Sequence, residues 1–238
     1  MGELYSAKCN ANGTSHKYLS TGFAAYMVYT DLETLNGLWK PTDYGSGVEY
    51  ADGALNLFPT QNQNNHNTRS SAGLQIGLWL NGSQGCFSIC EGKMDDQINH
   101  LISYLERSRA SKIFLRLGYE FDNPSFGYSD NPEMYILAFQ KIVSDCREYL
   151  SEDALSRVLF VWHSWAAPMA KESLSLTDFY PGDDFVDWIG VSIFQQVLPW
   201  SPYWGGKVSD IESVLDFAKK HDKVCLRGVI INASKPVF

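Results

Sequence analysis

The chain of 238 residues lacks the features of several common functional classes. It has no excess of basic residues, since 19 Lys and Arg stand against 27 Asp and Glu and give a net charge of −8. Nucleic-acid binding normally needs a basic face, so we expect no nucleic-acid partner. No apolar run reaches the length of a membrane span, and residues 1–20 lack the apolar stretch of a signal peptide. We therefore expect no membrane association.

Metal and nucleotide motifs are also missing. The five cysteines form no CxxC pair, and no Cys/His spacing is typical of zinc, so we expect neither a metal site nor a cofactor. Cys86 and Cys90 flank a segment that we interpret as a short loop, where an oxidising compartment would allow them to form a disulfide. No Gly-rich phosphate-binding loop follows an expected strand, which argues against an open, doubly wound sheet.

Aromatic residues are abundant instead. Seven Trp, 13 Tyr and 13 Phe make up 14% of the chain. Core packing explains most single aromatic residues, but aromatic faces also cover the apolar faces of sugar rings. A neutral sugar polymer is compatible with both this composition and the acidic charge, so we expect a polysaccharide or oligosaccharide partner.

Short apolar runs alternate with longer amphipathic segments, the pattern of βα units in a single domain, 1–238. The strands are almost continuously apolar, as in a parallel sheet covered by helices. The pattern predicts an α/β fold, a (β/α)8 TIM barrel of which five strands are recognisable. The expected strands are 24–29, 73–80, 112–118, 158–163 and 188–194, and the expected helices are 94–107, 132–150 and 209–220. Residues 47–58 form a helix or a compact turn, and the polar segment 61–71 is an exposed loop or an insertion.

Functional side chains of such barrels gather at the carboxyl ends of the strands. Those ends carry polar, aromatic and acidic residues here, without a nucleophilic Ser or Cys, which is typical of a saccharide cleft. Glu120 stands between Tyr119 and Phe121, where desolvation would raise its pKa and suit it to protonate a glycosidic oxygen. The alternative is a structural carboxylate that pairs with Arg116 or caps the following loop.

Three further polar residues admit two interpretations each. His163 could bind a substrate hydroxyl or orient Glu120, or it could be a hydrogen-bonded structural residue. Asp122 allows the same choice between site and structure. Asp184 follows Pro181-Gly182, and its pattern favours a turn before the next strand over a substrate contact.

Three segments in order resemble glycoside hydrolase family 26, which contains β-mannanases and β-1,3-xylanases. They are residues 114–122 (FLRLGYEFD), 161–164 (VWHS) and 180–192 (YPGDDFVDWIGVS), and the likeness extends over about residues 18–223. The resemblance implies a glycoside hydrolase acting on a β-linked polysaccharide, with Glu120 as acid/base. It also implies a substrate cleft formed by Tyr119, Asp122, Trp162, His163, Asp184 and Phe194. Mannanases of the family usually have His where Tyr119 stands, so this run resembles the β-1,3-xylanases more closely.

The family uses a retaining double-displacement mechanism with a second Glu, the nucleophile, at the end of a later strand that begins Lys-Pro-Val. Here Lys235-Pro236-Val237 is followed only by Phe238. We therefore expect that the nucleophile lies outside these residues, that 224–234 is an atypical segment, and that the barrel is incomplete at the C-terminus. No first strand is recognisable in residues 1–17, so the N-terminus is a second candidate for incompleteness.

The resemblance further implies a secreted protein, and we expect a monomer. Without the nucleophile, Glu120 alone would leave the chain inactive. One alternative is a non-catalytic carbohydrate-binding protein on the same barrel scaffold. Another is an unrelated α/β enzyme, for which the order of the three motifs would be a coincidence.

Overall fold

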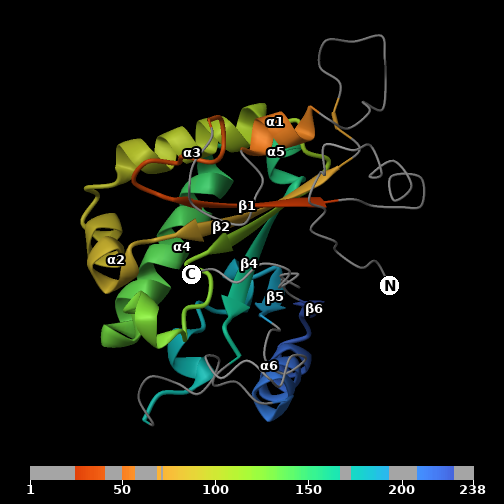
Figure 1. The fold of residues 1–238 in the computed structure, drawn as a ribbon. Coiled ribbons are helices and arrows are strands. Elements are labelled where there is room, and N and C mark those ends of the chain that lie inside the picture. Colours follow the sequence, from red (N-terminus) through yellow and green to blue (C-terminus); the bar gives the residue numbers. More distant parts are fainter. Residues whose placement is uncertain are drawn as a thin grey trace, which may run out of the picture.

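The computed structural model describes residues 25–40, 50–56, 69–70, 72–166, 173–192 and 208–227. In these ranges one parallel sheet has its six strands in chain order, and each strand pairs with the next (Figure 1). The strands are β1 (Ala25–Asp31), β2 (Gly73–Trp79), β3 (Ile113–Leu117), β4 (Val158–Ser164), β5 (Trp188–Val191) and β6 (Val224–Arg227). Strictly sequential parallel order is the arrangement of a (β/α) barrel, as expected from the sequence.

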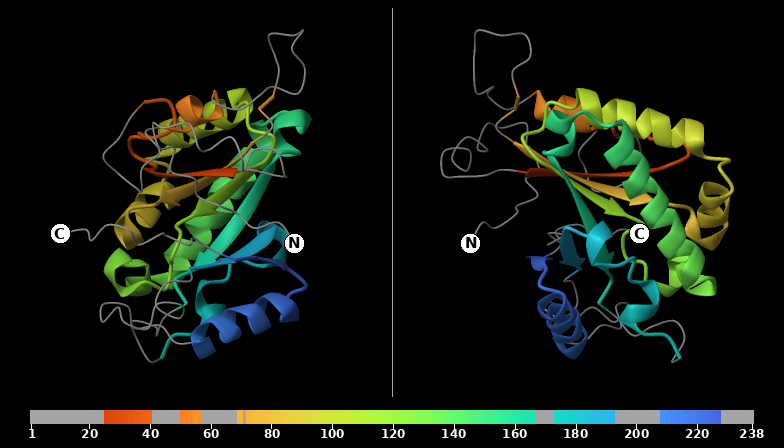
Figure 2. Two further views of the ribbon diagram at one scale, coloured as in Figure 1. Left: turned by 45° about the vertical axis from the view of Figure 1, so that its right-hand side comes forward. Right: turned by 180° about the vertical axis from the view of Figure 1, so that it is seen from behind.

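Helices connect these strands. Figure 2 shows the strands turning progressively from β1 in red to β6 in blue, while α3 and α4 run along one side of them. The helices are α1 (Ala51–Leu55), α2 (Gly82–Cys90), α3 (Asp95–Arg107), α4 (Pro132–Tyr149), α5 (Glu152–Leu155) and α6 (Val208–Lys220). None of the helices in the described ranges is long and apolar enough to cross a membrane.

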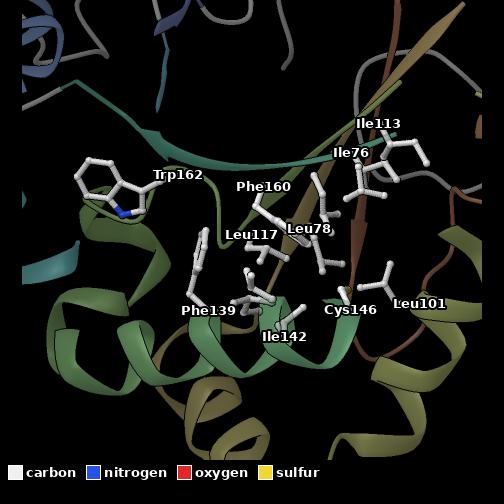
Figure 3. Packing of buried hydrophobic residues seen from close by; sticks show 14 of the residues in the cluster. Ile76, Leu78, Leu101, Ile113, Leu117, Phe139, Ile142, Cys146, Phe160 and Trp162 are labelled. Carbon is white, nitrogen blue, oxygen red and sulfur yellow. The ribbon is translucent and has the colours of Figure 1, made fainter. Parts of the chain in front are cut away.

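The main core lies between the sheet and α4. Alternate residues of β2, β3 and β4 point toward this helix, whose apolar side chains face them in Figure 3. Helix α4 begins where Pro132 takes the first helical position and the Asn131 side chain accepts a hydrogen bond from the Met134 N–H at 3.2 Å. The core residues drawn there, which are at most 2% exposed, include Ile76, Leu78, Ile113, Leu117, Phe139, Ile142 and Phe160.

The opposite face of the sheet is the inner face of the barrel. Because side chains alternate along a strand, the residues between those core positions point inward. Phe114, Val161 and Trp188 form a small separate cluster there. Arg116 and His163 occupy inward positions of β3 and β4 closer to the carboxyl ends of the strands.

One expectation from the sequence stays a prediction and another is wrong. Residues 224–227 form the regular strand β6 and 228–234 lie outside the described residues, so whether 224–234 is an atypical segment is not tested. The expected loop between Cys86 and Cys90 is the last turn of α2, and both side chains are free thiols. Gly82, Ser83 and Gly85 are weak helix formers, so local propensity concealed this helix, which tertiary packing against α4 stabilises.

The expected polar loop 61–71 lies almost entirely outside the described residues. Within it only Arg69 and Ser70 are described. The Ser70 N–H donates a hydrogen bond of 2.8 Å to the carbonyl oxygen of Arg109, so this end of the segment is anchored beside the start of β3.

Two residues of α4 allow a direct test of the core. Ile142 is fully buried, whereas Leu137 on the same helix is 41% exposed. We expect Ile142→Ala to lower the free energy of unfolding by about 2–5 kcal/mol, because it removes buried methyl groups and leaves a cavity. Leu137→Ala should change it by less than about 1 kcal/mol. Denaturant titration measures both, and equal losses would contradict the position of α4 against the sheet.

Candidate active site

The carboxyl end of β3 carries Glu120 on an unusual turn. Gly118 and Glu120 both have φ near +54°, a left-handed conformation that costs a non-glycine residue about 1 kcal/mol or more. Glycine is needed at position 118, because a Cβ there would lie 2.6 Å from the Tyr135 ring. The Glu120 N–H donates a 2.7 Å hydrogen bond to the His163 carbonyl oxygen, which ties the turn to β4.

The carboxyl group of Glu120 is buried, with only 5% of the residue exposed. Its Oε1 accepts a hydrogen bond of 2.6 Å from the Ser192 hydroxyl, which stands directly after β5. Its Oε2 accepts a weaker one, at 3.4 Å, from the Asn123 amide. Burial raises the pKa of Glu120 to about 7, against the opposing effects of Ser192, Arg116 and Asn123. Near neutral pH this carboxyl group can therefore both give and take a proton.

Arg116 lies on the inner face of β3, four residues before Glu120 in the chain. Its guanidinium carbon is 5.3 Å from the centre of the Tyr29 ring and 5.1 Å from that of Tyr119, which allows cation–π contact on both. Nη1 lies 3.3 Å from the Met27 sulfur, while Nε and Nη2 have no hydrogen-bond partner within the described part of the chain. No ion pair joins Arg116 to Glu120 among these residues, so the alternative of a structural salt bridge is not supported.

His163 is fully buried near the carboxyl end of β4, on the inner face of the sheet, and its ring packs on Gly190. A Cβ at position 190 would lie 2.3 Å from the His163 Cδ2, so β5 needs glycine here. Burial, and to a smaller extent the positive charge of Arg116, hold the pKa of His163 well below its usual value. The imidazole is therefore neutral at pH 7, and neither ring nitrogen has a partner in the described ranges. One nitrogen can donate and the other accept.

Asp122 has a structural position. Its two carboxyl oxygens accept hydrogen bonds of 2.5 Å from the Ser164 hydroxyl and the Trp165 N–H, so it links the loop after β3 to the end of β4. Burial raises its pKa to about 6, although the bonds from Ser164 and Trp165 oppose this. Both carboxyl oxygens accept hydrogen bonds from within the protein, so Asp122 holds the loop that carries Glu120 in place.

The remaining residues expected in the cleft are separated by the fold. Tyr119 lies beside Glu120 against Tyr29, with ring centres 5.1 Å apart. Trp162 points to the outer face of β4, is fully buried, stacks on Phe121 at 4.2 Å and donates its indole N–H to the Phe179 carbonyl oxygen.

Asp184 does not lie beside Glu120. Asp184 is exposed in the 3-10 turn Asp183–Phe185, which precedes β5, and its carbonyl oxygen accepts a hydrogen bond from Arg147. It therefore lies at the end of the sheet opposite Glu120, as the turn interpretation implies. Phe194 lies outside the described residues.

Within the described ranges, Ser192 and Asn123 are the hydrogen-bond partners of the Glu120 carboxyl group, and neither is among the cleft residues that the resemblance implies. Ser192 directly follows β5, and the rule that strand ends carry function selects it as a polar strand-end residue. Asn123 could not have been found in this way, because the left-handed turn at Glu120 decides which loop residue returns to the carboxyl group. Within the described ranges no group of three or more His, Cys, Asp or Glu side chains could hold a metal ion.

Comparison with known proteins supports the expected resemblance. No family model matches the chain. A β-1,3-xylanase from Alcaligenes sp. is 29% identical over 220 residues, which are 92% of this chain and 40% of that protein. The β-1,3-xylanase TXYA from Vibrio sp. is 28% identical over 220 residues, 92% of this chain and 41% of that protein. The chain thus spans about two-fifths of the length of these relatives.

Solved structures show the fold. A modular endo-β-1,4-mannanase of glycoside hydrolase family 26 from Cellulomonas fimi is similar with a TM-score of 0.53 and 15% identity, over 87% of this chain and 49% of that one. The catalytic domain of a family 26 endo-β-1,4-mannanase from Bacillus sp. JAMB-750 is similar with a TM-score of 0.52 and 12% identity, over 85% of this chain and 56% of that one. The expected resemblance to family 26 and the expected barrel fold are therefore confirmed.

The Ser192 hydrogen bond leads to a prediction about Glu120. Donation by the hydroxyl stabilises the carboxylate, so Ser192→Ala should raise the pKa of Glu120 further above about 7, by about one unit. Ser192→Thr keeps a hydroxyl and should leave the pKa nearer to that of the parent protein. Carbon-13 NMR titration of the Glu side chains measures the shift, and an unchanged pKa in Ser192→Ala would contradict the contact.

The raised pKa of Glu120 also predicts how stability depends on pH. The folded state binds the Glu120 proton more tightly than the unfolded state, so between about pH 4.5 and about pH 7 the free energy of unfolding falls as pH rises. Glu120→Gln should remove up to about 3 kcal/mol of this fall, and Asp122 should account for a further part between about pH 4 and 6. Denaturant titrations across this range test the slope.

The matched control for this measurement is Glu133→Gln, which makes the same chemical change at an exposed position of α4. It should keep the pH profile of the parent protein. Parallel profiles for Glu120→Gln and the parent would rule out a proton held by buried Glu120.

Proposed function

We propose that this chain provides the acid/base part of a retaining glycoside hydrolase that cleaves a β-linked polysaccharide, with Glu120 as the catalytic acid/base. The observation that carries this proposal is a buried carboxyl group with a pKa raised to about 7 at the carboxyl end of a barrel strand. Functional groups of parallel barrels concentrate there. No cation forms an ion pair with Glu120 in the described part of the chain, and burial without an ion pair favours the protonated form that a catalytic acid needs.

The chemistry follows from the proton on Glu120. In the first step the protonated carboxyl group donates its proton to the glycosidic oxygen as the bond to the leaving sugar breaks. In the second step the carboxylate takes a proton from the water that releases the enzyme-bound sugar. A pKa near 7 suits a group that must act in both directions near neutral pH.

A retaining mechanism needs a second carboxyl group about 5–5.5 Å from the first, as nucleophile. Asp122 is the acid whose charge bears on Glu120, but both of its oxygens are bonded to Ser164 and Trp165. We propose that the nucleophile is supplied from outside the described residues.

For the walls of the cleft we propose Tyr119 and His163, with Phe194 as a further candidate. Tyr119 presents an aromatic ring next to Glu120, and the neutral imidazole of His163 offers one donor and one acceptor to sugar hydroxyls. Trp162, Asp122 and Asp184 would act on the cleft only indirectly, by holding the strands and loops that form it.

Among substrates we favour β-1,3-xylan over mannan. The two curated relatives carry the name β-1,3-xylanase, and Tyr119 stands where mannanases of the family usually have His. A polysaccharide is too large to enter a cell, so we propose that the intact protein acts outside it. We also propose that it acts as a monomer, without a nucleic-acid or membrane partner.

The second candidate function is saccharide binding without cleavage. It is favoured by one observation, namely that the described residues contain a single carboxyl group placed for catalysis. This candidate predicts that the chain binds oligosaccharides and releases no reducing sugar on long incubation.

The enzyme proposal is tested with Glu120→Gln in the intact protein. Hydrolysis of β-1,3-xylan or mannan should fall by about 10²–10⁴-fold, since the variant cannot protonate the leaving group. The first step should fall much less on an aryl glycoside, whose leaving group departs without a proton. Release of reducing sugar and of the aryl group are the two measurements.

Glu133→Gln on the surface of α4 is the control and should keep full activity. Unchanged hydrolysis of the polysaccharide by Glu120→Gln would overturn the assignment of the acid/base. An equal loss on both substrates would argue for disturbed binding in place of lost proton transfer.

A further inference from the structure

A cavity lies far from Glu120, between α3, α1 and the segment that follows β1. Its volume is about 440 Å³, within the range of small-ligand sites. It lies around the last turns of α3, which leads into the start of β3, whereas Glu120 follows the end of β3. The seven residue-to-residue steps from Ile113 to Glu120 correspond to roughly 20 Å of extended chain. Figure 1 shows α1 beside the end of α3, away from the arrowheads of the strands.

One side of this cavity is aromatic. Trp39 is 40% exposed and its ring centre lies 6.2 Å from that of Tyr104, whose own ring is buried. An indole of this size left open to solvent beside a cavity is a flat apolar surface that a ligand can cover. The indole N–H of Trp39 makes no hydrogen bond with the described residues, so it remains available as a donor.

The other side carries polar groups that are held in place. The Tyr104 hydroxyl donates to Asp52 Oδ1 at 3.2 Å, and Oδ2 has no hydrogen-bond partner in the part of the chain that the structure describes, so it can accept from a ligand. Burial raises the pKa of Asp52, although Tyr104 and Arg107 oppose this shift. Arg107 donates its Nε–H to the Ser103 carbonyl oxygen at 2.9 Å, which orients the guanidinium group, and its terminal nitrogens have no hydrogen-bond partner among the described residues. His100 lines the same cavity.

The charges of these groups indicate what kind of ligand fits. Asp52 contributes a carboxylate and Arg107 a guanidinium, so the cavity carries no excess of one sign. An ionic ligand would be attracted by one of these two charges and repelled by the other. A neutral polyhydroxylated ring can form hydrogen bonds with both groups, because its hydroxyls donate to the carboxylate and accept from the guanidinium. Its C–H face can at the same time cover Trp39.

We propose that this cavity is a second saccharide-binding site, which takes sugar units of a neutral polysaccharide at a distance from Glu120. The choice of a polysaccharide as ligand rests on the proposed function. With the two sites at opposite ends of β3, a long polymer can stay attached at one while it is released from the other. The intact protein would then gain affinity for long chains and not for short fragments.

The test uses a linear β-1,3-xylo-oligosaccharide and a linear β-1,4-manno-oligosaccharide as probes. Titration into the chain should shift the NMR signal of the Trp39 indole N–H and of backbone amides near Arg107. Trp39→Ala should weaken this binding by about tenfold or more. Phe87→Ala is the matched control, because Phe87 is equally 40% exposed but lies on α2, outside the cavity.

Arg107→Met is a second variant that keeps the length of the side chain on an exposed helical turn and removes its donors. It should also weaken binding, and thermal unfolding checks that both variants fold. Absence of any shift at Trp39, or binding that is unchanged in Trp39→Ala and Arg107→Met, overturns the second site. Neither result bears on the acid/base, which the hydrolysis assay of Glu120→Gln decides separately.

Discussion

The pairing of β3 with β4 and of β4 with β5 is the constraint on which the candidate site depends. Arg116 pairs with Val161, and His163 with Gly190, so the ends of the three strands lie at one level. Beyond the last paired residues, the Glu120 N–H bonds to the His163 carbonyl and the Ser192 N–H to the Ser164 carbonyl. These two bonds extend the register into the turns. A slip by one residue would move every side chain to the opposite face and separate Ser192 from Glu120.

The same edge of the sheet gathers ionisable groups away from water. Glu120, Asp122 and His163 are each buried, and in each the burial favours the uncharged form. Such groups lower the stability of the fold relative to an apolar interior, and the left-handed turn at Glu120 adds strain. Buried carboxyl groups and backbone strain often occur together at active sites, where structure elsewhere compensates for them. Here the packing of α4 against the sheet provides that compensation.

The motifs that resemble family 26 divide into two kinds of residue. Some place chemical groups inside the barrel, as Glu120 and His163 do. Others hold the frame, as Trp162 does between the sheet and the outer helices, and as Asp122 does between two loops. A motif therefore marks a region that must keep its geometry, and the structure is needed to separate the residue that meets a substrate from the residue that positions it.

Much of the fold could be predicted from the sequence, because hydrophobic periodicity acts locally. The five apolar strands, the helix α4 with its Asn131 cap and the place of Glu120 at a strand end all follow from short-range patterns. Helix α2 and strand β6 could not be found in this way. Two glycines weaken the helical signal of α2, and β6 is a strand of four residues whose identity depends on pairing with β5.

For the site, the sequence by itself selected Glu120 as the candidate for the chemistry, since a carboxyl group beside aromatic residues after a buried strand is a local feature. Tertiary structure alone decided its surroundings. Ser192 reaches Glu120 across 72 positions of the chain, and alternation along β4 sends His163 inward but Trp162 outward. The physical reason is that burial, hydrogen bonding and the resulting pKa depend on atoms brought together by strand pairing, which no local pattern contains.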